Sequence, residues 1–250
     1  MLKNKIREII YKNDLLFRIY YKYVYKPKNE LEKFLDNFSQ NNIDNLFFIQ
    51  VGANDGMIND PFFKFIRRDN WKGLLIEPQS IIFERLRDNY SKFKEVTLEN
   101  VAISNREEIK KIFRISFSNS RRASGVSSFI KDELIRVLDA GYAELIAKEE
   151  NINLPINEEE WITTENVKCT SFNALIAKHK ITKVDLLAID TEGYDYEIIK
   201  TIPFNTIKPL VIIYEHTHFN EFVKTECSNF LSNLGYTLKV TTSDTIAELE

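Results

Sequence analysis

Cysteine and glycine are scarce in this chain of 250 residues, and long apolar runs are absent from it. The two cysteines, Cys169 and Cys227, form no CxxC pair and no disulfide framework, which fits a reducing compartment. The sequence shows no signal peptide with an apolar centre and no apolar run long enough to cross a bilayer. A net charge of −3 and a pI near 5.8 argue against general nucleic-acid binding. We therefore expect a cytoplasmic protein.

Linkers rich in proline, serine or glycine are also missing, so nothing divides the chain into separate domains. With 44% hydrophobic and 12% aromatic residues, the chain can bury a substantial core. We predict one domain over residues 41–250, with an insertion around 109–165, preceded by a helical segment over residues 1–40.

Positive charge is concentrated at the amino-terminal end. Residues 1–28 hold eight basic and two acidic side chains, a net charge of +6, which leaves −9 for the rest of the chain. Apolar side chains recur there at near-helical spacing, and they are Ile6, Ile9, Ile10, Leu16, Phe17, Tyr20, Tyr21 and Val24. A basic amphipathic helix of this kind can lie on the anionic inner face of a membrane. The alternative is a helix that packs its apolar side on the domain, or on a second subunit of a homo-oligomer.

Apolar runs alternate with helical periodicity along most of the chain. Strands are expected at 46–51, 73–77, 96–103, 184–190 and 210–215, helices at 61–68, 81–90, 171–178, 195–201 and 221–234, and a closing hairpin over 236–250. This alternation predicts an α/β fold with a mostly parallel sheet and helices on both faces.

The middle of the chain breaks this pattern. A strand at 113–117, a polar loop at 118–128, a helix at 130–149 and an acidic connection at 151–160 are expected there. We interpret this part as an insertion over the carboxyl edge of the sheet, where function concentrates.

One loop stands out because it follows a strand and holds two of the seven glycines. Gly52 and Gly56 flank Asp55 directly after strand 46–51. Glycine permits positive φ and close approach of another molecule to the backbone. A helix that begins soon afterwards would direct its N–H groups into the same crevice. The loop therefore predicts a nucleoside-binding site, with an ordinary strand-to-helix turn as the alternative.

Polar groups also follow the other predicted strands. Glu77 ends the second strand, Asn100 lies in the third, and Asp190 and Glu215 end two later ones. A carboxylate at the end of the second strand can accept both hydroxyls of a ribose.

Four blocks of this sequence, 49–56, 76–78, 100–102 and 190–193, resemble the signature blocks of FkbM-type methyltransferases. These are class I enzymes that depend on S-adenosylmethionine, and the resemblance runs from about 47 to 250. It implies a Rossmann-like fold with a mostly parallel seven-stranded sheet and an antiparallel closing hairpin. It also implies O-methylation of a hydroxyl, most often on a glycan or a secondary metabolite.

The resemblance assigns a cofactor role to twelve residues of four groups. The loop after the first strand would line the methionine and ribose part of S-adenosylmethionine with Gly52, Ala53, Asn54, Asp55 and Gly56. Glu77, next to Pro78, would hold the ribose hydroxyls. The adenine would lie near Asn100, Val101 and Ala102. The sulfonium end would face Asp190 and Thr191.

The acceptor site rests on fewer signals. Ser127 and Ser128 resemble a serine pair that recurs in the family and would line the acceptor pocket. Arg121 and Arg122 in the same loop would face a polar or anionic acceptor such as a sugar, or would simply be solvated. His218 is assigned to the acceptor side as well.

A sugar hydroxyl is a poor nucleophile and gains from a base that removes its proton. His216, one residue past strand 210–215, is the preferred base because the ordinary pKa of histidine is about 6.5. Asp190 or Glu192 are alternatives, or they would orient the histidine, and His216 could also be structural. The acidic and imidazole groups here would suffice for a divalent cation, but no spacing requires one, so metal dependence stays open.

Two other functions compete with methyl transfer. An NAD-linked oxidoreductase would use a G-x-G-x-x-G loop, and Asp55 would repel its pyrophosphate while tolerating a cationic sulfonium. A non-catalytic, membrane-associated protein of this fold would be expected to have lost Asp55, Glu77 and Asp190, yet all three are present.

Overall fold

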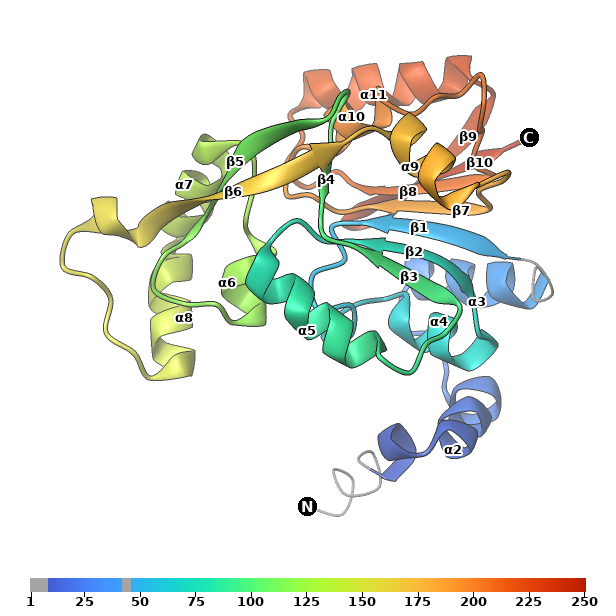
Figure 1. Ribbon diagram of the computed structural model, residues 1–250, viewed down its shortest axis with the longest axis horizontal. Helices are drawn as coiled ribbons and strands as arrows, with labels where there is room; N and C mark the ends of the chain where they lie inside the picture. Colours follow the sequence, from blue (N-terminus) through green and yellow to red (C-terminus); the bar gives the residue numbers. More distant parts are fainter. Residues whose placement is uncertain (1–8, 42–45) are drawn as a thin grey trace.

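A sheet of seven strands forms the centre of the computed structural model, which describes residues 9–41 and 46–250 (Figure 1). Its order is β3-β2-β1-β7-β8-β10-β9, and only β10 runs antiparallel to its neighbours. The strands are β1 (Phe47–Val51), β2 (Lys72–Ile76), β3 (Val96–Glu99), β7 (Leu186–Ile189), β8 (Val211–Glu215), β9 (Tyr236–Val240) and β10 (Asp244–Leu249). The predicted fold class is confirmed.

Helices cover both faces of this sheet, which explains why its central strands are apolar on both sides. One face packs Ile49 and Val51 against α9 (Phe172–His179), α10 (Asp195–Ile199) and α11 (Glu221–Asn233). The other face packs Phe48 and Leu75 against α3 (Glu30–Asn41), α4 (Phe63–Asp69) and α5 (Ser80–Tyr90).

A second, three-stranded sheet lies beside the first, at the left of Figure 1. Its order is β4-β6-β5, with β4 (Ala102–Ile103), β5 (Glu108–Ile115) and β6 (Ile162–Thr170). Between β5 and β6 the chain forms α6 (Arg121–Gly125), α7 (Lys131–Val137), the π-helical turn η2 (Leu138–Tyr142), α8 (Ala143–Glu150) and the short 3-10 helix η3 (Glu158–Trp161). These elements have a small apolar core of their own. The insertion predicted around 109–165 covers these elements together with most of β5 and the start of β6.

The predicted third strand is two strands in the structure. Its first half, β3, joins the main sheet, and its second half, β4, joins the second sheet. The side-chain amide of Asn100 donates to the backbone carbonyls of Glu77 (2.9 Å) and Pro78 (3.1 Å) at the point where the chain changes sheets.

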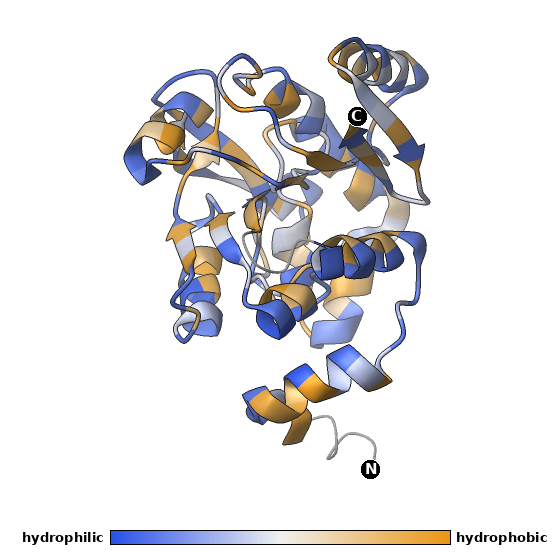
Figure 2. Ribbon diagram, turned by 90° about the vertical axis from the view of Figure 1, so that its right-hand side faces the viewer, coloured by the Kyte–Doolittle hydropathy of each residue, from blue (hydrophilic) through white to orange (hydrophobic). Residues whose placement is uncertain are grey.

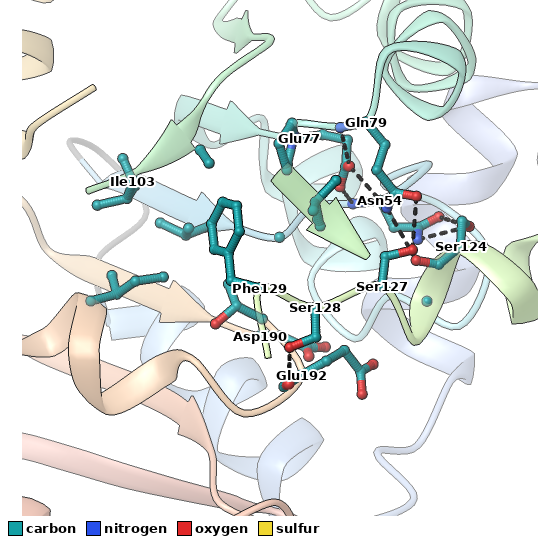
Figure 3. A pocket seen from close by; sticks show the side chains of 18 of the residues that line it. Asn54, Glu77, Gln79, Ile103, Ser124, Ser127, Ser128, Phe129, Asp190 and Glu192 are labelled. Carbon is teal, nitrogen blue, oxygen red and sulfur yellow. Dashed lines mark hydrogen bonds between the residues drawn. The ribbon is translucent and has the colours of Figure 1, made fainter. Parts of the chain in front are cut away.

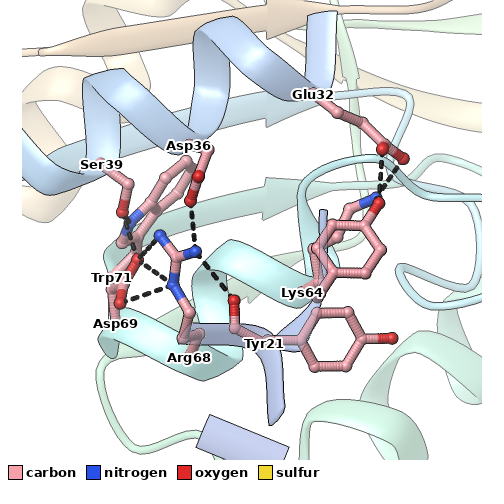
Figure 4. Close-up of polar contacts among 9 residues, drawn as sticks. Tyr21, Glu32, Asp36, Ser39, Lys64, Arg68, Asp69 and Trp71 are labelled. Carbon is pink, nitrogen blue, oxygen red and sulfur yellow. Dashed lines mark hydrogen bonds and ion pairs between the residues drawn. The ribbon is translucent and has the colours of Figure 1, made fainter. Parts of the chain in front are cut away.

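The arm (residues 9–28) includes α2 (Asp14–Ile19) and the π-helical turn η1 (Tyr20–Val24) and packs on α4. Phe17 is fully buried against Phe63 in the core of the main domain. Arg68 of α4 forms ion pairs with Asp36 and Asp69 and donates to the backbone carbonyl of Tyr21 (Figure 4). The arm is thus fixed to the domain by one face. The predictions for residues 1–8 fall outside the described residues.

In the described ranges 9–41 and 46–250, no helix combines the length and the apolar character that a membrane span requires.

Candidate functional site

Three neighbouring strands deliver polar groups to one edge of the sheet. β2, β1 and β7 are parallel and adjacent, so Glu77, Gly52 and Asp190 follow their carboxyl ends side by side. The chain leaves β1 toward β2 and later returns on its other side at β7. Such a reversal opens a crevice at the carboxyl edge, where α/β proteins bind ligands.

A cavity of about 620 Å³, here called the inner pocket, occupies this crevice (Figure 3). Its polar side chains come from the strand ends and from α6, and they are Asn54, Glu77, Gln79, Arg121, Ser124, Ser127, Ser128, Asp190, Thr191 and Glu192. Its apolar lining includes Val101, Ala102, Ile103, Ile112, Phe129 and Ile198. The lining thus combines hydrogen-bonding groups with apolar surface, as in pockets that hold small molecules and cofactors.

Glu77 is the most enclosed carboxylate of the inner pocket, with only 2% of its surface exposed. Its Oε2 accepts the N–H of Asn54 (2.9 Å), and its Oε1 accepts the N–H of Gln79 (2.8 Å). Burial raises the pKa of Glu77 to about 7, although these hydrogen bonds favour the ionised form. A further donor from a ligand would therefore lower this pKa.

The segment around α6 closes the inner pocket from above the sheet edge. Ser124 receives the side-chain amide of Asn54 (3.0 Å), and the hydroxyl of Ser127 donates to the side chain of Gln79 (3.0 Å). The hydroxyl of Ser128 donates to the backbone carbonyl of Glu192 (2.8 Å). Ser127 and Ser128, predicted for the acceptor site, thus lie in the same pocket as Glu77 and hold its wall together. Gln79 and Ser124 were not singled out from the sequence.

The two glycines of the first loop are explained by contacts within the protein. Gly52 has a φ of +82°, and a Cβ there would come within 1.8 Å of the Asp190 carbonyl oxygen. Gly56 has a φ of +65°, and a Cβ there would come within 2.6 Å of Leu86 and Tyr90. Gly52 lines the inner pocket, whereas Gly56 faces α5.

We expect Gly52→Ala to destabilise the fold by at least about 3 kcal/mol, because strain at positive φ adds to a collision with backbone. Gly141→Ala is a matched control: its φ is +87°, but the nearest atom would be 3.9 Å from the new Cβ. The control should lose only about 1–2 kcal/mol. Thermal unfolding of the two variants measures the difference, and equal losses would contradict the close packing of β1 on β7.

The remaining predicted cofactor residues divide into two groups. Pro78, Val101, Ala102 and Thr191 line the inner pocket. By contrast, Ala53, Asp55, Gly56 and Asn100 do not line it. The carboxylate of Asp55 accepts the N–H groups of Met57 (3.0 Å) and Ile58 (2.9 Å) in its own loop. The electrostatic argument that used Asp55 to choose between cofactors is therefore not supported by its position.

A group of acidic side chains gathers at the ends of β7 and β8. Asp190 is exposed to the crevice, and desolvation by the surrounding protein together with the charges of Glu192 and Glu215 raises its pKa well above the ordinary value. His218 lies between Glu192 (Nε2 to Oε2, 2.9 Å) and Glu133 (Nδ1 to Oε2, 3.2 Å). The hydrogen bond with Glu192 is the main reason why the pKa of His218 rises to about 9. His218 is thus a cation at neutral pH.

The structure places His216, the preferred base, away from this group. Its Nδ1 lies 3.0 Å from the hydroxyl of Thr245, and its N–H donates to the carbonyl of Ser243. Burial lowers its pKa below the ordinary value. His216 follows β8, is turned toward β10 and lines neither of the two cavities described in this section, so its position does not support the predicted role as base. The side chain two residues later, His218, contacts the carboxylates instead, although it lines neither cavity itself.

In the described part of the chain, one group of side chains has the spacing of possible metal ligands, and it consists of Glu192, Glu215 and His218. Their ligand atoms lie within 4.8 Å of one another. The proton of His218 offsets only one of the two negative charges, and Oε2 of Glu215 has no hydrogen-bond partner.

A second cavity, here called the arm cleft, opens on the other side of Asp190. It lies between the arm, α4 and the carboxyl edge of the sheet, and its volume of about 1230 Å³ includes space that is open to solvent. Three tyrosines of the arm line it, together with charged and polar groups, namely Tyr11, Tyr21, Tyr25, Lys28, Asn29, Glu32, Asn59, Asp60, Lys64, Asp190, Glu215, Ser243 and Asp244. Asp190 is shared with the inner pocket. Of these three tyrosines, only Tyr21 was singled out from the sequence, as part of an amphipathic helix, and Tyr11 and Tyr25 were not.

The two arginines of the α6 segment point to different places. Arg121 lines the inner pocket and donates from Nε to the carbonyl of Ile58 (3.2 Å). Arg122 is half-exposed and pairs with Glu149 of α8 (2.5 Å), so the structure does not bring it to either cavity.

Comparison with known structures finds several methyltransferases at low identity. An FkbM methyltransferase from Methylobacillus flagellatus is 11% identical, with 82% of this chain and 44% of that chain covered and a TM-score of 0.49. An O-methyltransferase from Bacillus cereus in complex with SAH is 10% identical, with 97% and 90% covered and a TM-score of 0.47. A precorrin-6y C5,15-methyltransferase from Geobacter metallireducens is 14% identical, with 91% and 92% covered and a TM-score of 0.43. No curated protein matches the chain.

The family assignment rests on the match to a family model rather than on these distant likenesses. The methyltransferase FkbM domain matches residues 50–238, which is more than half of the chain. This chain therefore belongs to the FkbM family of S-adenosylmethionine-dependent methyltransferases.

Proposed function

We propose that the protein transfers a methyl group to a hydroxyl, and that this hydroxyl belongs to a sugar of a glycan or glycolipid. The observation that carries the proposal is the meeting of two cavities at Asp190. The inner pocket is enclosed and partly apolar, as a cofactor site requires, and the arm cleft is wide and polar. A donor and an acceptor would thus approach one carboxylate from opposite sides.

The inner pocket fits S-adenosylmethionine by the chemistry of its lining. Oε2 of Glu77 accepts a single N–H, and a carboxylate oxygen can accept two hydrogen bonds, so a ribose hydroxyl would find an acceptor there. Val101, Ala102 and Phe129 supply apolar surface for an adenine ring. When bound, S-adenosylmethionine supplies an electrophilic methyl group on a cationic sulfonium.

The arm cleft fits a sugar acceptor. Tyrosine combines an apolar ring, on which the C–H face of a sugar can pack, with a hydroxyl that can hydrogen-bond to it. Tyr21 and Tyr25 offer such rings, and Asp60 and Lys64 offer charged partners for sugar hydroxyls.

Asp190 is the residue that we assign as general base. It lines the arm cleft, and its raised pKa brings it toward the working pH, where a base is most effective. In its ionised form it would accept the proton of an acceptor hydroxyl held in the cleft. His218, a cation beside Glu192 and Glu215, limits how far these neighbours raise the pKa of Asp190.

The two histidines of this region are expected to differ sharply when each is replaced by alanine. His216→Ala should change kcat less than about threefold, because the ring contacts Thr245 rather than a cavity. His218→Ala removes a cation from the carboxylates and should shift the rising limb of the pH–kcat profile to higher pH. Initial rates between pH 6 and 10 test both. A large loss in His216→Ala with an unshifted His218→Ala profile would contradict this assignment.

The proposed acceptor is tested by incubating the enzyme and S-adenosylmethionine with cell-surface glycan extracts. Mass spectrometry should show the gain of one methyl group in the carbohydrate fraction. Asp190→Asn serves as the inactive control. Methylation confined to molecules that contain no sugar would refute the sugar acceptor, and the absence of any transfer by an enzyme that binds S-adenosylmethionine would favour the non-catalytic alternative.

A further inference from the structure

The arm has a second apolar face, and no described element covers it. Six large hydrophobic side chains of the arm are exposed, namely Ile9, Leu15, Leu16, Ile19, Tyr23 and Val24. Leu15 and Tyr23 keep 67% and 74% of their surface accessible. A cluster of apolar groups at the surface of a folded protein indicates an interaction site.

These side chains form a stripe on the outer side of the helix. Leu15, Ile19 and Tyr23 recur at intervals of four residues, which places them on one helical face. Phe17 and Tyr21 occupy the opposite face. The ring of Phe17 packs on the ring of Phe63, and the backbone carbonyl of Tyr21 accepts a hydrogen bond from Arg68. Figures 1 and 2 show the arm at one end of the molecule, so its outer face is accessible. We call this stripe the outer face.

Positive charge surrounds the outer face. The arm holds exposed cations at Lys12, Arg18, Lys22, Lys26 and Lys28. Its one acidic residue, Asp14, already pairs with Arg67 of α4 (2.6 Å). The arm therefore has a net charge of +4, while residues 29–250 have a net charge of −9. The charge distribution is strongly polarised along the molecule.

We propose that the outer face docks on the surface of an anionic lipid bilayer. Aliphatic and tyrosine side chains flanked by lysine and arginine are the composition of helices that lie in the membrane interface. Nucleic acid would pair with the cations but would leave the aliphatic groups in water. A second copy of the chain would bring two cationic arms together, and their positive charges would repel each other. The acidic remainder of the chain is repelled by the same bilayer, which fixes the orientation.

Docking by the outer face would place the arm cleft close to the lipid. Tyr21 lines the cleft from the inner side of the same helix, and Tyr25 lines it directly after the helix ends. An acceptor anchored in the bilayer would then enter the cleft without leaving the membrane surface. Docking itself does not depend on the proposed acceptor, and it is tested without one.

Co-sedimentation of the full chain with lipid vesicles tests the proposal. We expect binding to vesicles of phosphatidylcholine with phosphatidylglycerol, at least tenfold weaker binding to phosphatidylcholine alone, and loss of binding in about 1 M salt, where charges are screened beyond about 3 Å. Leu15→Glu with Ile19→Glu should reduce binding more than tenfold. Phe222→Glu, at a side chain that is 69% exposed on α11, is the matched control and should bind like the wild type.

Three results would overturn the proposal. The first is equal binding, or no binding, to the two kinds of vesicle. The second is unchanged binding of the Leu15→Glu, Ile19→Glu variant, whose fold is checked by its thermal unfolding. The third is a wild-type dimer in sedimentation velocity that this variant converts to a monomer, since the outer face would then be covered by a second copy.

Discussion

Replacing Asp190 by asparagine should reduce kcat by roughly 100- to 10,000-fold, the usual contribution of a general base. The same substitution should make the protein more stable at pH 8. Asparagine keeps the size of the side chain and removes a negative charge that Glu192 and Glu215 oppose. Loss of activity with a gain in stability is expected where a functional group is held in an unfavourable environment.

The pH dependence of this stability change has a definite sign. The folded state raises the pKa of Asp190, so ionisation disfavours folding, and the wild type loses stability as pH rises from about 4 through the raised pKa. Below about pH 4 the carboxyl is protonated in both the folded and unfolded states. The variant should therefore gain nothing in thermal unfolding at pH 4 and gain clearly at pH 8.

Asp195→Asn is the matched control for Asp190→Asn. Burial and the charges of Glu215 and Glu192 raise the pKa of Asp195 to about 8, but its side chain lines neither the inner pocket nor the arm cleft. This variant should also gain stability at pH 8 and should keep far more activity than Asp190→Asn. Equal losses of kcat in the two variants would indicate that the total negative charge of the acidic side chains at the ends of β7 and β8 sets the rate, and not a base at position 190.

Replacing Glu77 by glutamine should weaken the binding of S-adenosylmethionine by at least about tenfold. The carboxylate accepts two backbone N–H groups in the inner pocket, and an amide nitrogen placed against either would meet a donor instead of an acceptor. The proposed hydrogen bond to a ribose hydroxyl would be weakened as well. Isothermal titration measures the change, and His216→Ala is the control that should bind like the wild type.

The affinity for S-adenosylmethionine should also fall as pH decreases through about 7. Burial brings the pKa of Glu77 to about 7, and hydroxyl donors favour its ionised form, so binding competes with protonation. Below this pKa the affinity should drop by up to about tenfold for each pH unit, and Glu77→Gln should remove this dependence. An equal affinity at pH 6 and pH 8 in the wild type would show that Glu77 does not hold the ligand.

Local sequence patterns were sufficient to predict the main sheet. The apolar runs around Phe48, Leu75 and Leu187 read as buried strands because helices cover both faces, and the order of strands and helices then fixed the parallel topology. The second sheet was not predicted, because β6 is specified by its antiparallel pairing with β5, and the paired residues are 61 positions apart at the Glu108–Cys169 end and 47 at the Ile115–Ile162 end. Pairing at such a distance leaves little local signal.

Part of the site was predicted as well, because some of its residues directly follow strands that the sequence predicts. Glu77, Asp190 and Thr191 follow strands, and the topology alone brings strand ends together. The direction of a side chain within a loop is set by its hydrogen bonds, which the sequence does not show. Asp55 is turned toward its own loop, and His216 is turned to Thr245 while His218 reaches the carboxylates. The cofactor and acceptor roles of these residues stay predictions.

The most direct test of the account is a titration of the wild-type protein with S-adenosylmethionine and, in parallel, with NAD at pH 8. We predict binding of S-adenosylmethionine at micromolar concentration, weakened in Glu77→Gln, and no binding of NAD. Failure of the wild type to bind S-adenosylmethionine at high micromolar concentration, or binding that Glu77→Gln leaves unchanged, would contradict the assignment of the inner pocket as the methyl-donor site.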